Sequence, residues 1–353
     1  MILSSQHSII LFPKKKKRVN KNLSYSDVCL VPNYSRCFSR SDCDTSVNLF
    51  GRKFELPIVP ANMKSVINMN LAKWMSEKDY FYIMHRFDNS LKDIVSSMND
   101  ENWKTISVSS GVKLKDKSDI LQLAKSKQRI DFITIDIAHG HCERMKTMIS
   151  HIKKLFPSVK VIAGNVATPS AVRDLASWGA DMVKVGIGQG SPCTTKDKTG
   201  FTMPMFTCTQ QCSEIYNDIP FEDLTLHELK TEQNSKRVPI IADGGIKSNG
   251  DIAKALVAGA DMVMAGGLFA SCTDSPASVI DINGVNHKAY FGSASFENKG
   301  HNNHIEGKLN KIPTSRLSLK EKLSEIKQDI QSALSYAGGE NLSAFQNVEY
   351  IEQ

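Results

Sequence analysis

Eight short segments rich in β-branched and other apolar residues recur along this chain. They begin roughly every 25 residues, with one longer interval between the sixth and the seventh. That interval fits a strand, a crossover helix and two loops. Nearly continuous apolar strands predict parallel pairing with both faces buried. The segments are residues 56–60, 80–84, 105–109, 131–135, 159–163, 181–185, 238–242 and 261–265.

Eight such units predict an α/β fold, the (β/α)8 barrel, in which the chemistry lies on loops at the carboxyl ends of the strands. The alternative is a doubly wound open sheet, but no Gly-x-Gly-x-x-Gly run follows the first segment. Helix signals fit the same reading. Thr168 and the proline after it open a helix that Gly179 ends, and Ser248 opens another that Gly259 ends.

The remaining chain extends this single unit. Residues 319–334 predict an amphipathic helix, and residues 1–20 lack any periodicity. We therefore expect a disordered basic extension over residues 1–20 and one catalytic barrel domain over residues 21–353.

Charge and cysteine usage limit the partners of the chain. The net charge is +7, and residues 14–18 alone carry five positive charges, so the body is nearly balanced and no general nucleic-acid surface is expected. No apolar stretch reaches the length of roughly 18 residues that a membrane span needs. Eight cysteines without a Cys-x-x-Cys pair indicate reduced thiols and a cytoplasmic location. The basic run 13–19 reads equally as a nuclear-import signal or as a solvated tail.

Two long insertions, residues 186–237 and 267–313, follow predicted strands on the predicted active face. The first opens with the glycine-rich loop Gly-Ile-Gly-Gln-Gly-Ser-Pro-Cys, which ends at Cys193. A cysteine on such a loop is a nucleophile where its thiol becomes thiolate, or else it fills a packing gap. The second insertion is polar, and we expect it to form a mobile flap.

The seventh and eighth segments are each followed by a Gly-Gly pair. Loops at these two places in barrels often bind phosphate through backbone amides. Asp243 precedes the first pair, and a ribose diol suits its two oxygens. The alternative is a tight turn that Asp243 caps.

Ordered motifs along residues 23–350 resemble the IMP dehydrogenase/GMP reductase family. They include the Cys193 loop, Ala-Asp-Gly-Gly-Ile at 242–246 and Gly-Ser-Ala-Ser at 292–295. Further matches are Pro-Ala-Asn-Met at 60–63, Met-His-Arg at 84–86, Ile-Ala-Gly-Asn-Val at 162–166, Glu-Gly-Lys at 306–308 and Ser-Tyr-Ala-Gly-Gly at 335–339.

Within that family the chain is most similar to bacterial-type reductases. Residues 84–105 leave no room for the regulatory domain that dehydrogenases usually carry there. Their Arg-Tyr pair in the flap is also missing, since Arg316 is the one arginine after position 270 and Leu317 follows it. The fourth segment is followed by Asp-Ile-Ala-His-Gly at residues 136–140, which is similar to the motif of the reductases.

The resemblance implies NADPH-dependent reductive deamination of GMP to IMP and ammonia, a step of purine nucleotide interconversion and salvage. It implies a covalent thioimidate on Cys193, with Thr195 and Glu306 handling protons. An IMP dehydrogenase without its regulatory domain and a non-catalytic purine nucleotide-binding protein remain the alternatives.

The resemblance also implies binding residues and an assembly. Substrate contacts would come from Ser191, Asp243, Gly245, Gly266, Gly267, Tyr290, Gly292 and Ser293. Cofactor contacts would come from Arg86, Asp136, Ile137, Ala138, Ile187 and Gly188, with Ser39 and Arg40 supplied by a neighbouring subunit. A homotetramer is expected, and carbonyls of Gly188, Gly190 and Cys193 would hold a monovalent cation, K⁺.

One stretch departs from the family pattern. Residues 201–237 are longer than expected and do not read like relatives. Cys208 and Cys212 lie there at i, i+4 spacing. With no further ligand placed, we expect these cysteines to pack a helix rather than to bind a metal.

Overall fold

A curled parallel sheet forms the centre of the molecule. The computed structural model describes residues 22–214, 237–301 and 303–353. Seven strands follow the order β4-β10-β9-β8-β7-β6-β5. Their bounds are β4 Ile58–Pro60, β5 Ser107–Ser110, β6 Phe132–Asp136, β7 Lys160–Val166, β8 Met182–Val185, β9 Ile240–Asp243 and β10 Met262–Ala265.

The second predicted segment, residues 80–84, lies beside β5 but pairs with it at one point. Met84 forms a parallel bridge with Val108, and its N–H donates to the Ser107 carbonyl at 3.0 Å. Its neighbours Phe81 to Ile83 are buried without forming a ladder. The (β/α)8 prediction is therefore confirmed, with this segment held by burial more than by strand pairing.

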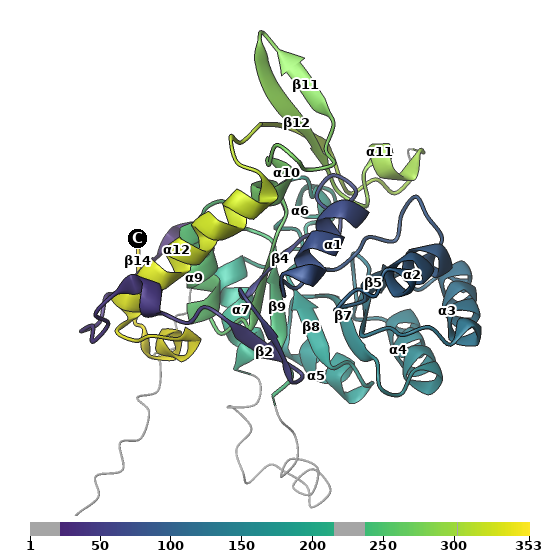
Figure 1. Cartoon of the computed structure of the whole chain (residues 1–353), viewed down its shortest axis with the longest axis horizontal. Coiled ribbons are helices and arrows are strands. Elements are labelled where there is room, and N and C mark those ends of the chain that lie inside the picture. The colour runs from purple at the N-terminus through teal and green to yellow at the C-terminus, as the bar shows by residue number, and fades with distance from the viewer. Residues whose placement is uncertain (1–21, 215–236, 302) are drawn as a thin grey trace, which may run out of the picture.

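Helices cover the outside of the sheet (Figure 1). They are α1 Met69–Glu77, α2 Leu91–Asp100, α3 Leu114–Ser126, α4 Glu143–Leu155, α5 Pro169–Ser177, α7 Met205–Ser213, α9 Asn249–Val257 and α12 Leu319–Ala337. The predicted starts of α5 and α9 are confirmed, since Thr168 and Ser248 occupy their N-cap positions. The last helix runs three residues beyond the prediction and ends at Gly338, whose φ is 87°.

Short elements complete the chain around the barrel. Strand β1 (Val28–Leu30) pairs with β14 (Tyr350–Glu352), and β2 (Val47–Leu49) pairs with β3 (Arg52–Phe54). The 3-10 helices of the described residues are Tyr25–Asp27, Arg40–Asp42 and Leu342–Asn347. The predicted tail over residues 1–20 and the basic run 13–19 lie outside the described residues.

Within its described residues, the first insertion contains α6 (Thr195–Thr199) and α7. Cys208 and Cys212 are both buried on α7, so the packing prediction for them is confirmed. Residues 215–236 of this insertion are outside the described part of the chain.

The second insertion is more ordered than a polar loop. It contains α10 (Gly267–Ala270), β11 (Val279–Ile282), β12 (Val285–Phe291), α11 (Phe296–Lys299) and β13 (Leu309–Pro313). The three strands form an antiparallel sheet, and β11 and β12 project from the barrel as an arm in Figure 1. The loop part of the flap is the stretch between β12 and β13.

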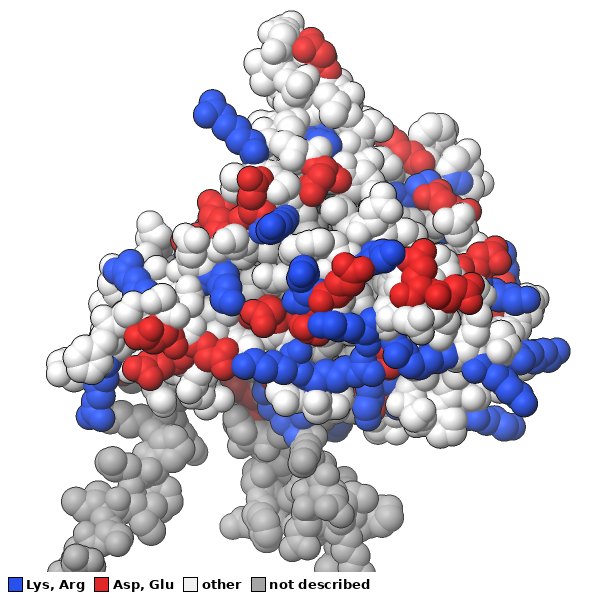
Figure 2. Space-filling view, viewed as in Figure 1, with Lys and Arg blue, Asp and Glu red and all other residues white. Residues whose placement is uncertain are grey.

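The surface agrees with a balanced charge. On the face shown in Figure 2, Lys and Arg side chains are interspersed with Asp and Glu, with more blue than red toward its lower edge. Within the described residues, no helix has the length and apolar character that crossing a membrane requires. All eight cysteines have free thiols.

Candidate active site

A pocket of about 660 Å³ opens at the carboxyl ends of the barrel strands. All the residues predicted for catalysis and for substrate binding line it, as do the predicted cofactor residues from Arg86 onward. Ser39 and Arg40 do not line it. The Arg40 guanidinium instead lies 5.4 Å from the Tyr336 ring and donates to Ser332 at 3.4 Å.

Three side chains form a chain of hydrogen bonds in this pocket. The Cys193 thiol donates to the Thr195 hydroxyl with a sulfur–oxygen distance of 3.2 Å. The Thr195 hydroxyl in turn donates to Glu306 Oε2 at 2.6 Å. A proton on the sulfur therefore has a continuous path to a carboxylate, which is the arrangement that turns a thiol into a nucleophile.

Backbone pairing between the cysteine loop and the flap places Glu306. Cys193 and Gly307 form an antiparallel bridge. The Thr194 N–H donates to the Glu306 carbonyl at 2.9 Å, and the Lys308 N–H donates to the Pro192 carbonyl at 2.9 Å. The glutamate is thus held beside the cysteine by main-chain contacts on both sides of it.

A glycine makes room for a buried tyrosine near the second Gly-Gly pair. A Cβ atom at Gly266 would lie 2.0 Å from the Tyr290 hydroxyl oxygen, whereas one at Gly267 would meet nothing closer than 3.9 Å. Burial raises the pKa of Tyr290, with Asp243 and Cys193 adding to the effect, so its hydroxyl stays protonated and able to donate. Nearby, Ser191 accepts a hydrogen bond from the Asn310 amide at 2.9 Å.

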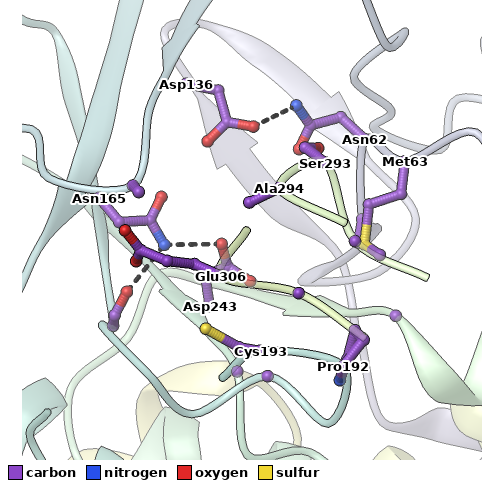
Figure 3. Close-up of a pocket in the computed structure, with 18 of the residues that line it drawn as sticks. Asn62, Met63, Asp136, Asn165, Pro192, Cys193, Asp243, Ser293, Ala294 and Glu306 are labelled. Atoms are coloured by element: carbon purple, nitrogen blue, oxygen red, sulfur yellow. Dashed lines mark hydrogen bonds between the residues drawn. The ribbon is translucent and has the colours of Figure 1, made fainter. Parts of the chain in front are cut away.

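A buried lysine that the sequence prediction missed joins two carboxylates in the pocket. Lys184 Nζ lies 3.1 Å from Asp136 Oδ1 and 3.2 Å from Asp243 Oδ2. Asn62 donates to Asp136 at 2.7 Å, and Asn165 donates to Asp243 at 2.8 Å (Figure 3). The available signal was a charged residue inside a segment read as a buried strand, because unpaired lysines are almost never fully buried.

These contacts set the charge states. Burial by itself raises the pKa of Asp136, but Lys184, Asn62 and Arg86 together lower it below its ordinary value. Burial by itself lowers the pKa of Lys184, but Asp136 and Asp243 raise it above its ordinary value. At neutral pH Asp136 is therefore a carboxylate and Lys184 an ammonium.

The predicted cofactor and cation residues lie around the same network. Arg86 donates to the Asp136 carbonyl at 3.3 Å, and its guanidinium lies 5.1 Å from the Phe87 ring. In the cysteine loop, the Gly190 carbonyl accepts the Cys193 N–H at 2.9 Å. Among the described residues no group of three or more His, Cys, Asp or Glu side chains is placed to hold a metal ion.

The fold and the pocket place the chain among (β/α)8-barrel proteins whose functional site lies at the carboxyl ends of the strands. Residues 22–353 match the model of the IMP dehydrogenase / GMP reductase domain. The chain is 45% identical over 327 residues to a GMP reductase of Leptothrix cholodnii, covering 93% of this chain and 94% of that protein. It is 44% identical to the GMP reductases of Staphylococcus saprophyticus, over 94% of this chain and 95% of that one, and of Staphylococcus aureus, over 94% and 96%. The chain therefore belongs to the IMP dehydrogenase/GMP reductase family and is an oxidoreductase enzyme.

Proposed function

We propose that this enzyme reduces GMP with NADPH, giving IMP, ammonia and NADP⁺ with the uptake of one proton. The observation that carries the proposal is the Cys193–Thr195–Glu306 chain of hydrogen bonds in the pocket. The names of the similar proteins favour the same reaction. The product would re-enter the purine nucleotide pool, in a salvage role.

Carbon 2 of guanine is a poor electrophile, and its amino group is a poor leaving group. In the proposal, the Cys193 sulfur adds to carbon 2 while its proton passes through Thr195 to Glu306. The protonated relay then returns a proton to the departing amine, and ammonia leaves. A thioimidate between Cys193 and the purine remains, and the sulfur is expelled when carbon 2 has been reduced.

The donor set of the pocket fits a dinucleotide beside the purine. Asp136 and Asp243 offer carboxylate oxygens suited to ribose hydroxyls, and Arg86 and Lys113 add positive charge suited to phosphates. When bound, NADPH supplies the hydride. Asp136, Ile137, Ala138, Ile187 and Gly188 would hold it on this subunit, and Ser39 and Arg40 would reach it from a neighbour.

The substrate would bind on the opposite part of the pocket. Its phosphate would contact Ser191, Gly245, Gly266 and Gly267, with Tyr290, Gly292 and Ser293 beside it, and Asp243 would bind the ribose. We further propose that the enzyme is a homotetramer located in the cytosol. Carbonyl oxygens of the Cys193 loop would bind K⁺.

The deciding experiment measures NADPH absorbance with GMP, and NADH formation from IMP and NAD⁺, on the same preparation. The proposal expects oxidation of NADPH that depends on GMP, with release of equimolar ammonia. Faster turnover of IMP with NAD⁺ would instead identify a dehydrogenase. Tight GMP binding without turnover in either direction would identify a nucleotide-binding protein.

A further inference from the structure

Lys184 is a lysine in the middle of a buried parallel strand. All four residues of β8 are buried, and the other three are apolar. A buried ammonium is costly unless it is paired and hydrogen-bonded. Here it is compensated twice, since Nζ lies 3.1 Å from Asp136 and 3.2 Å from Asp243.

The two carboxylates belong to strands that are not neighbours. Asp136 ends β6 and Asp243 ends β9, and β7 and β8 lie between those strands in the sheet. No ladder pairing therefore joins these two residues. The Lys184 side chain, projecting from β8, contacts both of them across the inside of the barrel.

The neighbouring strand packs closely against the backbone and Cβ of residue 184. A Cβ atom at Gly164 on β7 would lie 2.5 Å from Lys184 Cβ and 2.7 Å from the Lys184 carbonyl oxygen, so only glycine leaves the space. The next residue, Asn165, donates to Asp243 Oδ2, the same oxygen that Lys184 contacts. Asp243 Oδ1 has no hydrogen bond or ion pair to the described part of the chain and is available to a ligand.

Electrostatics require a cation at this place. Two carboxylates that face one cavity repel each other, and without compensation one of them binds a proton. A protonated carboxyl accepts fewer hydrogen bonds than a carboxylate, which offers about four lone-pair sites. Although burial raises the pKa of Asp136, Lys184 and Arg86 help to lower it below its ordinary value. Lys184 Nζ also lies 3.2 Å from Asp243, so each carboxylate that faces the ligands has a cation beside it.

We propose that Lys184 is a positioning residue for both ligands at once: it fixes Asp136 for the dinucleotide and Asp243 for the purine nucleotide. This inference rests on the proposed function for the identity of the two ligands. Lys184 would affect both binding sites, whereas Asp136 would affect only the dinucleotide site and Asp243 only the purine nucleotide site.

The test measures two dissociation constants on the full-length protein without turnover. GMP binding is followed by calorimetry, and NADPH binding by the fluorescence of the reduced nicotinamide. We expect Lys184→Met to raise both constants by about tenfold or more, because each carboxylate loses its buried cation. Asp136→Asn should raise only the NADPH constant, and Asp243→Asn only the GMP constant. Lys184→Arg keeps the charge and should restore both constants to within about threefold of wild type.

Lys153→Met is the matched control. Lys153 is a partly buried lysine on α4 that pairs with Asp181, the residue just before β8 begins, at the opposite end of the strand from the pocket. The Lys153→Met variant also loses a lysine–carboxylate pair near β8, but this pair lies away from the pocket. Both of its dissociation constants should therefore stay within about twofold of wild type.

A charge-balanced double variant covers the case in which Lys184→Met does not fold. Lys184→Met with Asp136→Asn removes one charge of each sign, and its GMP constant should still exceed that of Asp136→Asn alone. Equal GMP constants in those two proteins, or unchanged constants in a folded Lys184→Met, would overturn the inference and leave the proposed function intact. A wild-type protein that binds neither GMP nor NADPH would overturn the proposed function and this inference together.

Discussion

The Thr195 hydroxyl donates to the Glu306 carboxylate over 2.6 Å, although 111 positions separate the two residues in the chain. The contact depends on the flap lying against the cysteine loop, where Cys193 and Gly307 pair. In the proposed reaction, the glutamate is the end of the proton path from the sulfur.

Glu306→Gln should therefore lower the turnover number far more than the affinity for GMP. The amide keeps the shape of the side chain but cannot take up the proton, and loss of general acid–base catalysis costs about 10²- to 10⁴-fold. Steady-state kinetics with GMP and NADPH, together with GMP calorimetry, measure both quantities. Equal losses of rate and affinity would show that Glu306 binds the substrate instead.

Cys193→Ala should bind GMP but release no ammonia, because the sulfur is the group that bonds to carbon 2 in the proposed reaction. We expect a rate loss of about 10³-fold or more, since no covalent route remains. Mass spectrometry of wild-type protein quenched during turnover should show a purine nucleotide adduct on the peptide that carries Cys193. Cys142→Ala is the matched control, as Cys142 is a partly exposed free thiol outside the pocket lining. Normal ammonia release by Cys193→Ala would remove the nucleophile from the proposal.

Much of the barrel could be predicted from the sequence, because a strand that is buried on both faces appears as a short, nearly continuous run of apolar residues. Each predicted strand contains or overlaps an observed one, apart from residues 80–84, where Met84 alone is bridged. Apolar side chains are buried there without a ladder, and periodicity does not distinguish the two situations. The strands of the flap could not be predicted in this way, because β12 carries three polar residues among its first four and lacks a continuous apolar run.

The charged network could not be predicted in the same way. Asn62 binds Asp136 across 74 positions, and Asn165 binds Asp243 across 78. Contacts at such separations are created by barrel closure and leave no spacing pattern. In contrast, Cys193 and Glu306 each lie in a short sequence motif of the family, so each residue could be identified from its own motif without knowing that the two are close in space.

Gly266→Ala should destabilise the protein by about 1–3 kcal/mol, the usual cost of overpacking a buried site. The added methyl group would lie 2.0 Å from the Tyr290 hydroxyl oxygen, so the buried tyrosine must move. Urea denaturation measures the loss, and GMP affinity should fall with it. Gly267→Ala is the control, because its Cβ would stay 3.9 Å from the same ring and should change stability by less than about 0.5 kcal/mol. Equal effects of the two substitutions would contradict the steric argument.

His85 should make the folded state sensitive to mild acid. It is buried, its ring stacks on Phe87, and its Nδ1 accepts the Phe87 N–H at 3.2 Å. Burial lowers the pKa of His85, and Lys64 adds to this while Asp88 opposes it. The unfolded chain, with a histidine pKa of about 6.5, therefore binds a proton more readily than the folded protein.

Stability from this histidine is present above that pH and is lost as the pH falls through about 6.5 toward the lower pKa of the folded state. His85→Asn keeps a hydrogen-bond acceptor but removes the titration. The difference in unfolding free energy between wild type and His85→Asn should thus be larger at pH 7.5 than at pH 5.5, by about 1.4 kcal/mol for each unit by which the pKa is lowered. Urea denaturation of both proteins at both pH values measures it, and all other titrating groups cancel in the difference. A difference that does not change with pH, or that grows in acid, would show that His85 accepts its proton in the folded state without cost.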